Sequence, residues 1–401
     1  MPLVVQAYTA TTACGAGRAA LSAALRTGRS GLTANDLEWA PLSCWIGRVR
    51  EAEERPLPPE YADYDCRNHR LARLALEQDG FMQAVAAARG AHGAGRIGLF
   101  IGTSTSGIRS TEIAYTARDA QGDLPAWFRY GSMHNLDATS EFVRRWLGLE
   151  GPSMTLSTAC SSSAKVFCLA ERFIRLGLID AAVVGGVDSL CLTTLYGFNS
   201  LQLVSPDVCR PFDAERRGLS IGEAAGFALL ARGPDAQDGA QFGGLRLLGY
   251  GETSDAHHMS TPHPEGEGAA RAMREALQRA QLRPQDIGYV NLHGTATPAN
   301  DRAEGRAVQS VLGGATPCSS TKGHTGHALG AAGITEAVIA MLALEGQFLP
   351  GSPTTREVEA GIGCDIVLAP REVRGARLSS VMSNSFGFGG SNCTLIFGRS
   401  V

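Results

Sequence analysis

The feature that most constrains the fold is the alternation of short apolar runs with helical segments along the whole chain. Strands that are buried on both faces are nearly continuous in apolar or small residues. Six such runs occur, at 96–104, 181–189, 226–231, 287–295, 380–388 and 393–398. Helical candidates lie at 67–89, 137–147, 161–176, 266–282, 299–312 and 329–345. This alternation predicts an α/β protein with layered, mostly buried sheets.

A polar, glycine-rich segment at 232–246 is the clearest internal boundary. It divides the chain into an N-terminal half, 1–240, and a C-terminal half, 241–401, which carries most of the histidines. Each half contains a strand-like run that ends in a glycine-rich loop and is followed by a helix. We therefore expect two similar halves, although no repeat is visible residue by residue.

Charge and hydropathy exclude several classes of protein. The 401 residues carry a net charge of −3, so no global basic field exists to attract nucleic acid. The first residues lack the basic segment and the long apolar run of a signal peptide, and no stretch of 18 apolar residues follows. We therefore expect a cytoplasmic protein with no membrane span and no nucleic-acid partner.

Ten cysteines are scattered along the chain without a CxxC pair or a cluster with zinc-finger spacing. Most are expected to be small hydrophobic residues of a reducing compartment. Cys160, in LSTACSSSAKVF (156–167), differs because it falls at a predicted strand-to-helix turn among small neighbours. A helix N-terminus lowers the pKa of a thiol and can hold a developing oxyanion. The segment alone leaves a buried structural cysteine equally open.

Two loops of the C-terminal half place histidines beside predicted strands and helices. His293 follows an apolar run in NLHGTATPAND (291–301), and Lys322, His324 and His327 lie in SSTKGHTGHALGAAG (319–333). A single histidine is more often structural than catalytic, but function concentrates on loops that rigid elements hold. The second loop is not a P-loop, because its lysine precedes the glycines. His324 and His327 lack a HExxH partner, so zinc is not expected.

The segment NSFGFGGSN (384–392) follows another predicted strand. Its three glycines allow a tight turn and a close approach of the backbone to a neighbour. One interpretation is a simple β-turn. The other is a loop whose N–H groups point into a site, with Phe386 or Phe388 as a movable apolar wall.

Taken together, these motifs resemble the β-ketoacyl-acyl carrier protein (ACP) synthases, in the chain-elongating branch with a Cys-His-His triad. TACSSS, HGTATPAND, KGHTGH with GAAG, and NSFGFGGSN stand in the family's order, and PFDAERRGLSIGEAAG (211–226) resembles its FDxxRxG stretch. The resemblance covers essentially the whole chain. It implies a thiolase-like fold of two similar halves in five αβαβα layers, usually as a dimer.

The resemblance also implies roles for the residues that match its motifs. Cys160 would be the nucleophile that accepts the acyl chain. His293 and His327 would bind the malonyl thioester oxygen and assist decarboxylation. Lys322, with Glu336 in GITEAV, would order the histidine loop.

Further implied roles concern the acyl group and the carrier arm. The N–H groups of Cys160 and Phe388 would form an oxyanion hole, with Phe388 or Phe386 as the gate of the acyl pocket. Thr295 and Thr297 would touch the phosphopantetheine arm that carries the substrates. No metal and no other cofactor is expected, because decarboxylation of the malonyl group itself supplies the carbon nucleophile.

Departures from related families narrow the expected reaction. Initiating synthases carry asparagine in place of His327, and thiolases need a second catalytic cysteine, whereas Cys393 lies beyond the glycine-rich loop in a predicted strand. His324 stands where many relatives carry methionine, and Ala296 where many carry glycine. Because the stretch 185–202 is also less familiar, the acyl-chain preference stays open.

The expected activity is decarboxylative Claisen condensation with malonyl-ACP, in fatty-acid or polyketide/polyene biosynthesis. Alternatives are a non-condensing, chain-length-factor-like subunit of a heterodimer and a Cys-His thioester hydrolase. Expected partners are ACP, acyl and malonyl thioesters, and either a second copy or a related subunit. Arg67 and Arg70, one helical turn apart, form either a solvated face or an ACP docking patch.

Overall fold

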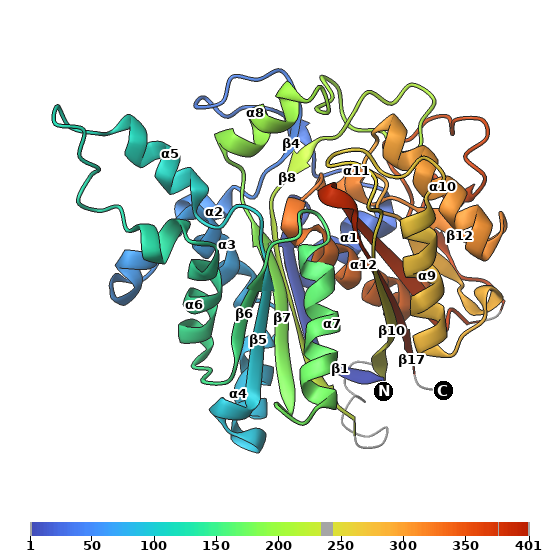
Figure 1. The fold of residues 1–401 in the computed structure, drawn as a ribbon, viewed down its shortest axis with the longest axis horizontal. Coiled ribbons are helices and arrows are strands. Elements are labelled where there is room, and N and C mark those ends of the chain that lie inside the picture. The colour runs from blue at the N-terminus through green and yellow to red at the C-terminus, as the bar shows by residue number, and fades with distance from the viewer. Residues whose placement is uncertain (1, 234–243, 376, 400–401) are drawn as a thin grey trace.

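The structure of the chain is a computed structural model that describes residues 2–233, 244–375 and 377–399 (Figure 1). The predicted boundary between the halves at 240/241 lies outside the described residues. One large sheet joins strands from both ends of the sequence. Across this sheet the strands follow the order β14 (Asp365–Ile366), β12 (Pro317–Ser319), β11 (Tyr289–Asn291), β16 (Ser380–Gly387), β17 (Ser391–Arg399), β10 (Leu245–Ser254), β1 (Leu3–Thr12), β9 (Ala224–Arg232), β7 (Ala181–Asp188), β5 (Ile97–Gly102) and β6 (Ser153–Leu156).

The sheet consists of two half-sheets that meet where β1 lies beside β10. Only two register pairs, Leu3↔Leu247 and Val4↔Arg246, join these strands, whereas β1 pairs with β9, and β10 with β17, along nearly their whole lengths. In each half, parallel strands are followed by two antiparallel ones. They are β6, β5 and β7 followed by β9 and β1, and β14, β12, β11 and β16 followed by β17 and β10. This repeated pattern confirms the expectation of two similar halves.

Helices form three layers around and between the half-sheets. α7 (Ser162–Arg175) and α12 (Ala332–Gly346) lie in the middle, because each contacts strands of both halves. The outer helices are α1 (Gly17–Thr27), α3 (Arg67–Leu76) and α4 (Phe81–His92) on the N-terminal half and α9 (Glu267–Ala280) and α10 (Pro298–Leu312) on the C-terminal half. The result is the predicted αβαβα arrangement.

Apart from Thr335 and Glu336, the buried part of helix α12 is apolar on every side because it is enclosed on every side. All of its residues from 332 to 344 are buried. The segment Leu329–Gly346 is also long and apolar enough to cross a membrane, but 89% of it is buried inside the protein, as in a core helix. Where α12 crosses α7, a Cβ on Gly333 would lie 2.5 Å from the Ala164 nitrogen, so only glycine permits this approach.

Two predicted elements are shorter in the structure than in the sequence pattern. The helix predicted over 67–89 is two helices, α3 and α4, because Asp79 and Gly80 between them adopt left-handed φ values of 56° and 70°. The strand predicted over 287–295 is only β11, because the chain leaves the sheet to form the loop of His293. The remaining elements are α2 (Glu51–Glu54), α5 (Ile108–Thr116), α6 (Leu136–Leu147), α8 (Leu192–Ser200), α11 (Lys322–Thr325), β2 (Gly15–Ala16), β3 (Thr33–Ala34), β4 (Trp45–Gly47), β8 (Ile221–Gly222), β13 (Phe348–Leu349) and β15 (Arg371–Glu372), with short 3-10 or π turns.

Candidate active site

Cys160 lies at the sharp turn between β6 and α7, as the sequence predicted. Ala159 before it has a left-handed φ of 52°, and Ser161 after it is the N-cap residue of α7. The Cys160 side chain is only 5% exposed. The turn therefore places the thiol at the inner end of the helix N-terminus, between the two halves.

Burial dominates the acid–base behaviour of this thiol. It raises the pKa of Cys160 to about 11, although the Lys322 charge and the backbone N–H of Phe388 act in the opposite direction. The sequence-based prediction of a lowered pKa is therefore wrong. It considered the helix N-terminus but had no information on how completely the sulfur is removed from water.

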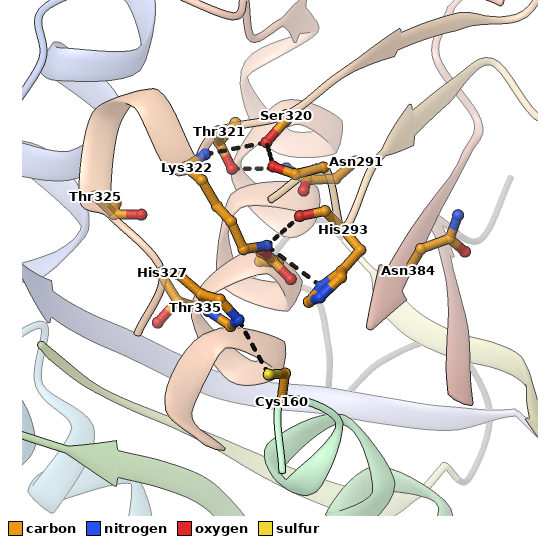
Figure 2. A network of polar contacts seen from close by, with 12 residues as sticks. Cys160, Asn291, His293, Ser320, Thr321, Lys322, Thr325, His327, Thr335 and Asn384 are labelled. Carbon is orange, nitrogen blue, oxygen red and sulfur yellow. Dashed lines mark hydrogen bonds and ion pairs between the residues drawn. The ribbon is translucent and has the colours of Figure 1, made fainter. Parts of the chain in front are cut away.

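His327 contacts the sulfur directly. Its Nε2 lies 3.0 Å from the Cys160 Sγ (Figure 2). The Leu329 backbone N–H donates to its Nδ1 at 3.2 Å. Burial, followed by the Lys322 charge, holds the pKa of His327 well below its usual value, so the ring is neutral near pH 7. Because Nδ1 accepts a hydrogen bond, the single ring proton sits on Nε2 and faces the sulfur.

His293 provides a second hydrogen-bond donor beside His327. The rings of His293 and His327 lie 5.3 Å apart and nearly perpendicular. Lys322 Nζ lies 3.4 Å from the His293 Nδ1 and also donates to the His293 carbonyl (Figure 2). An ammonium group beside Nδ1 requires a lone pair there, so the His293 proton also sits on Nε2. Burial, followed by the Lys322 and His327 charges, lowers the pKa of His293, which keeps the ring neutral.

Lys322 is the centre of a buried ionic network. Its side chain is 2% exposed and forms an ion pair with Glu336, which is 4% exposed and lies on α12. Burial raises the pKa of Glu336 to about 7, while the Lys322 charge acts against this rise. The predicted partnership of Lys322 with Glu336 is thus present, and it connects the histidine loop to the central helix layer.

Glu304 and Asn384 also hold this centre, and no sequence motif indicated this role for either residue. Glu304 accepts the backbone N–H groups of His293 and Gly294 at 2.8 and 2.7 Å, and Asn384 donates to the same carboxylate at 3.2 Å. Glu304 stands in the buried stripe of α10, between Ala303 and Ala307. A charged residue inside an apolar helical stripe was the signal that could have revealed it.

Cys160, His293 and His327 place three potential metal-binding atoms within 4.8 Å of one another. A metal would require a lone pair on each imidazole nitrogen that faces the sulfur. In both rings that nitrogen carries the proton, because Leu329 N–H and the Lys322 ammonium occupy the opposite nitrogen. The arrangement therefore suits a pair of hydrogen-bond donors better than a metal ion.

A cavity of about 370 Å³ gives access to these three side chains. Thr295 and Thr297 lie on its polar side, and their hydroxyl oxygens are 2.8 Å apart. Its apolar lining consists mainly of Phe198, Leu201, Leu203, Leu219, Phe386 and Phe388. A thiol and two neutral imidazole donors at one end of a partly apolar cavity suit covalent chemistry on an acyl group.

Comparisons with known proteins decide the family. Residues 68–236 match the family model described as "Beta-ketoacyl synthase, N-terminal domain", and residues 246–355 match "Beta-ketoacyl synthase, C-terminal domain". The chain belongs to the β-ketoacyl synthase family. This confirms the resemblance seen in the sequence, and members of this family are condensing enzymes of the acyltransferase class.

Individual relatives agree over nearly the whole length. The chain is 33% identical to 3-oxoacyl-(acyl-carrier-protein) synthase 2 of Staphylococcus aureus over 376 residues, covering 88% of this chain and 93% of that one. A chain of the complex of the ketosynthase ApeO with its chain length factor ApeC, from Xenorhabdus doucetiae, superposes with a TM-score of 0.88 at 38% identity, covering 99% of this chain and 98% of that one. A chain of the ishigamide ketosynthase/chain length factor superposes with a TM-score of 0.87 at 27% identity, covering 100% of this chain and 99% of that one.

The glycine-rich loop of the synthase approaches Cys160 closely. A Cβ on Gly387 would lie 2.8 Å from the Thr158 carbonyl and 3.2 Å from the Cys160 nitrogen, so glycine is required there. Phe388 follows in a short turn and is half-buried. Phe386 lies within strand β16 and packs against the His293 ring at 5.9 Å. Of the two predicted gate residues, Phe386 is held within a strand of the sheet, whereas Phe388 lies in the turn after that strand.

Two other predicted features of the synthase lie away from the thiol. His324 is buried, and its Nδ1 contacts the Arg29 carbonyl at 2.9 Å, so it supports loop packing. Ala296 has a left-handed φ of 66°, a conformation that glycine adopts without strain.

The predicted docking patch needs a correction. Arg67 is only 10% exposed and forms ion pairs with Glu53 and with Glu223, which is fully buried. Arg70 is 25% exposed and binds Asp65 in a two-point contact at 2.6 Å. The guanidinium of Arg67 is therefore a structural ion-pair partner, and its burial leaves almost no surface for a carrier protein.

Proposed function

We propose that this synthase extends a Cys160-bound acyl chain by two carbons through decarboxylative Claisen condensation with malonyl-ACP. The observation that carries the proposal is the 3.0 Å contact of His327 with the Cys160 sulfur, with His293 beside it in the same cavity. One thiol and two neutral imidazole donors serve the two chemically different halves of such a reaction.

The first half-reaction is acyl transfer to the enzyme. The Cys160 thiol loses its proton and attacks the carbonyl carbon of the incoming thioester as a thiolate, and the carrier sulfur leaves as a thiolate that takes up one proton. The His327 Nε2–H donates to the sulfur and stabilises its anionic form. The N–H groups of Cys160 and Phe388 are suited to the tetrahedral oxyanion, because Gly387 holds the loop against the nucleophile.

The second half-reaction creates the carbon nucleophile. Cleavage of the bond to the malonyl carboxylate releases CO₂ and leaves the electron pair as an enolate on the thioester. The Nε2–H groups of His293 and His327 are aimed at that oxygen, and a donor of this kind contributes about 3–4 kcal/mol to the transition state. The enolate carbon attacks the acyl-Cys160 carbonyl, and the sulfur leaves.

No step of this scheme is an oxidation or a reduction by the protein. Decarboxylation supplies the electron pair, so no redox cofactor and no metal takes part in the proposed steps. Thr295 and Thr297 line the same cavity and would bind the amide groups of the phosphopantetheine arm. Lys322 and Glu336 keep the histidine loop in place.

We also infer that the functional unit contains a second subunit of the same fold. The ketosynthase ApeO was solved in complex with its chain length factor, and the ishigamide ketosynthase was likewise solved with a chain length factor. In this chain, the arm around α5 projects from the body of the molecule (Figure 1). This arm and the edge strand β6 expose large apolar side chains, namely Ile113, Tyr115, Leu124, Trp127, Tyr130, Leu136 and Met154. An edge strand beside exposed apolar residues is a surface that a partner would cover.

The test is mass spectrometry of the intact protein with acyl-ACP and then malonyl-ACP. We expect the acyl mass on Cys160, followed by a β-ketoacyl product and CO₂. The matched Cys160→Ala variant should gain no acyl mass. A wild-type chain that never acylates would indicate a non-condensing subunit, and free acid without β-ketoacyl product would indicate a thioester hydrolase. Either result would overturn the proposal.

A further inference from the structure

Helix α8 forms an outer wall of the active-site cavity and is only lightly anchored. Phe198 on this helix and Leu201 directly after it line the cavity, yet Leu195 is the single fully buried residue of α8. The Phe198 ring lies 5.5 Å from the Phe388 ring, at an angle of 33°. The position of α8 therefore sets the space available to Phe388 and to an acyl chain beside it.

The N-terminus of α8 has no cap of its own. Its N-cap residue, Cys191, makes no side-chain capping bond, and the first N–H groups of a helix have no partner within the helix. Glu112 on α5 supplies the missing acceptors. Its Oε2 accepts the Leu192 N–H at 2.9 Å, and its Oε1 accepts the Thr193 N–H and hydroxyl at 2.7 and 2.8 Å. The negative charge also complements the positive end of the helix dipole.

Glu112 is itself held in place. Its side chain is 11% exposed, and Arg109 lies 3.3 Å from its Oε2. The Arg109 guanidinium in turn lies 3.8 Å from the centre of the Trp39 ring. Glu112 is not among the residues that line the cavity. Its influence on the reaction would therefore pass through α8.

We propose that Glu112 is a positioning residue that sets the acyl-chain preference of the synthase by holding Phe198 against Phe388. The inference rests on the proposed function, since an acyl chain bound to Cys160 would lie beside these rings. Without the carboxylate, the Leu192 and Thr193 N–H groups lose their acceptors and the first turn of α8 frays. The wall then becomes looser, while the two histidines, held by Glu304 and Lys322, keep their geometry.

Two steps of the reaction are measured separately to test this. Cys160 acylation is followed by mass spectrometry with a panel of acyl-ACP primers of increasing length, and CO₂ release is followed with malonyl-ACP. In Glu112→Ala the preferred primer should lose about fivefold relative to the others, the size expected from loss of a helix cap, while CO₂ release stays unchanged. Hydrogen exchange at the Leu192 and Thr193 amides should become faster.

Two variants and one control make the outcome decisive. Glu112→Gln keeps one acceptor oxygen and should fall between wild type and Glu112→Ala, which also covers a failure of the alanine variant to fold. Phe198→Ala combined with Glu112→Ala should shift the primer profile no further than Phe198→Ala alone. Glu141→Ala, which removes an arginine-paired carboxylate on α6, should keep the wild-type profile.

The inference is overturned by either of two results in an active protein. One is a Glu112→Ala variant with the wild-type primer profile. The other is an equal loss of acylation and CO₂ release, which would indicate general destabilisation. A wild-type chain that neither acylates nor releases CO₂ would instead refute the proposed function itself.

Discussion

The catalytic centre and the α8 wall of the same cavity are built in opposite ways. In the centre, charged groups are buried with their partners, as Lys322 and Glu336 are at 2% and 4% exposure. In the wall, α8 buries one residue fully, and one carboxylate from a neighbouring helix caps its N-terminus. The contrast indicates that the catalytic residues are held rigidly in the interior. Substrate preference depends instead on helix α8, which can move at a small cost in free energy. Changes in the centre should remove a reaction step, and changes in the wall should redistribute substrates.

The largest effect is expected inside the centre. His327→Ala removes one of the two N–H donors to the enolate and should slow CO₂ release from malonyl-ACP by about 10²–10³-fold. Cys160 should still become acylated, although more slowly because its sulfur loses the His327 donor, and mass spectrometry of the intact protein checks this. Unchanged CO₂ release would show that the enolate oxygen binds elsewhere. His324→Ala is the matched control, because His324 faces the Arg29 carbonyl and not the cavity.

The second prediction compares a buried arginine ion pair with a more exposed one on the same helix. Arg67→Ala leaves the fully buried Glu223 without its ion-pair partner and should lower the free energy of unfolding by about 3 kcal/mol. The Arg70→Ala control, at a more exposed ion pair, should cost no more than about 1 kcal/mol. Chemical denaturation measures both. Normal stability of Arg67→Ala together with weaker binding of acyl-ACP would restore the docking role.

The third prediction separates the two half-reactions by pH. Because the pKa of Cys160 is raised to about 11, the thiolate fraction and the acylation rate should increase about tenfold per pH unit from pH 6 to 9. The pKa values of His293 and His327 are lowered, so both rings stay neutral above pH 7 and CO₂ release should be flat there. Acylation and CO₂ release are measured at several pH values in assays that are quenched at fixed times. A flat acylation profile would mean that the thiolate is already formed at neutral pH.

The smallest effect is expected in the wall. Phe198→Leu keeps an apolar side chain but removes the ring contact with Phe388, which should change the ratio between long and short primers by about threefold. CO₂ release should not change. A uniform loss for all primers would contradict the assignment of this wall to chain-length preference.

The motifs predicted the residues of the centre because each lies where a strand ends, and strand ends of the two halves meet at the same cavity. Cys160, His293, Lys322 and His327 were found in this way. Glu304 was not, because its contact with His293 depends on how α10 packs, which local sequence does not express. The raised pKa of Cys160 was missed for the same reason, since burial follows from the packing of both halves.

The errors at the periphery have a different origin. The spacing of Arg67 and Arg70 described one helix face correctly, but it gave no information on the acidic residues that cover Arg67, which are Glu53 on α2 and Glu223 between β8 and β9. Similarly, 67–89 has continuous helical periodicity, and the break at Asp79 and Gly80 depends on left-handed backbone angles. Glu112 and Leu192 are 80 residues apart, so only the folded chain brings the cap to α8.

The burial of Cys160 has a further consequence, for the chemical lifetime of the protein. Peroxides attack thiolates and not thiols, and a pKa of about 11 leaves about one thiolate in ten thousand at pH 7. The resting nucleophile should therefore resist oxidation to sulfenic acid, although the cavity leads to it. Acylation would protect the sulfur further, because a thioester has no thiolate for a peroxide to attack.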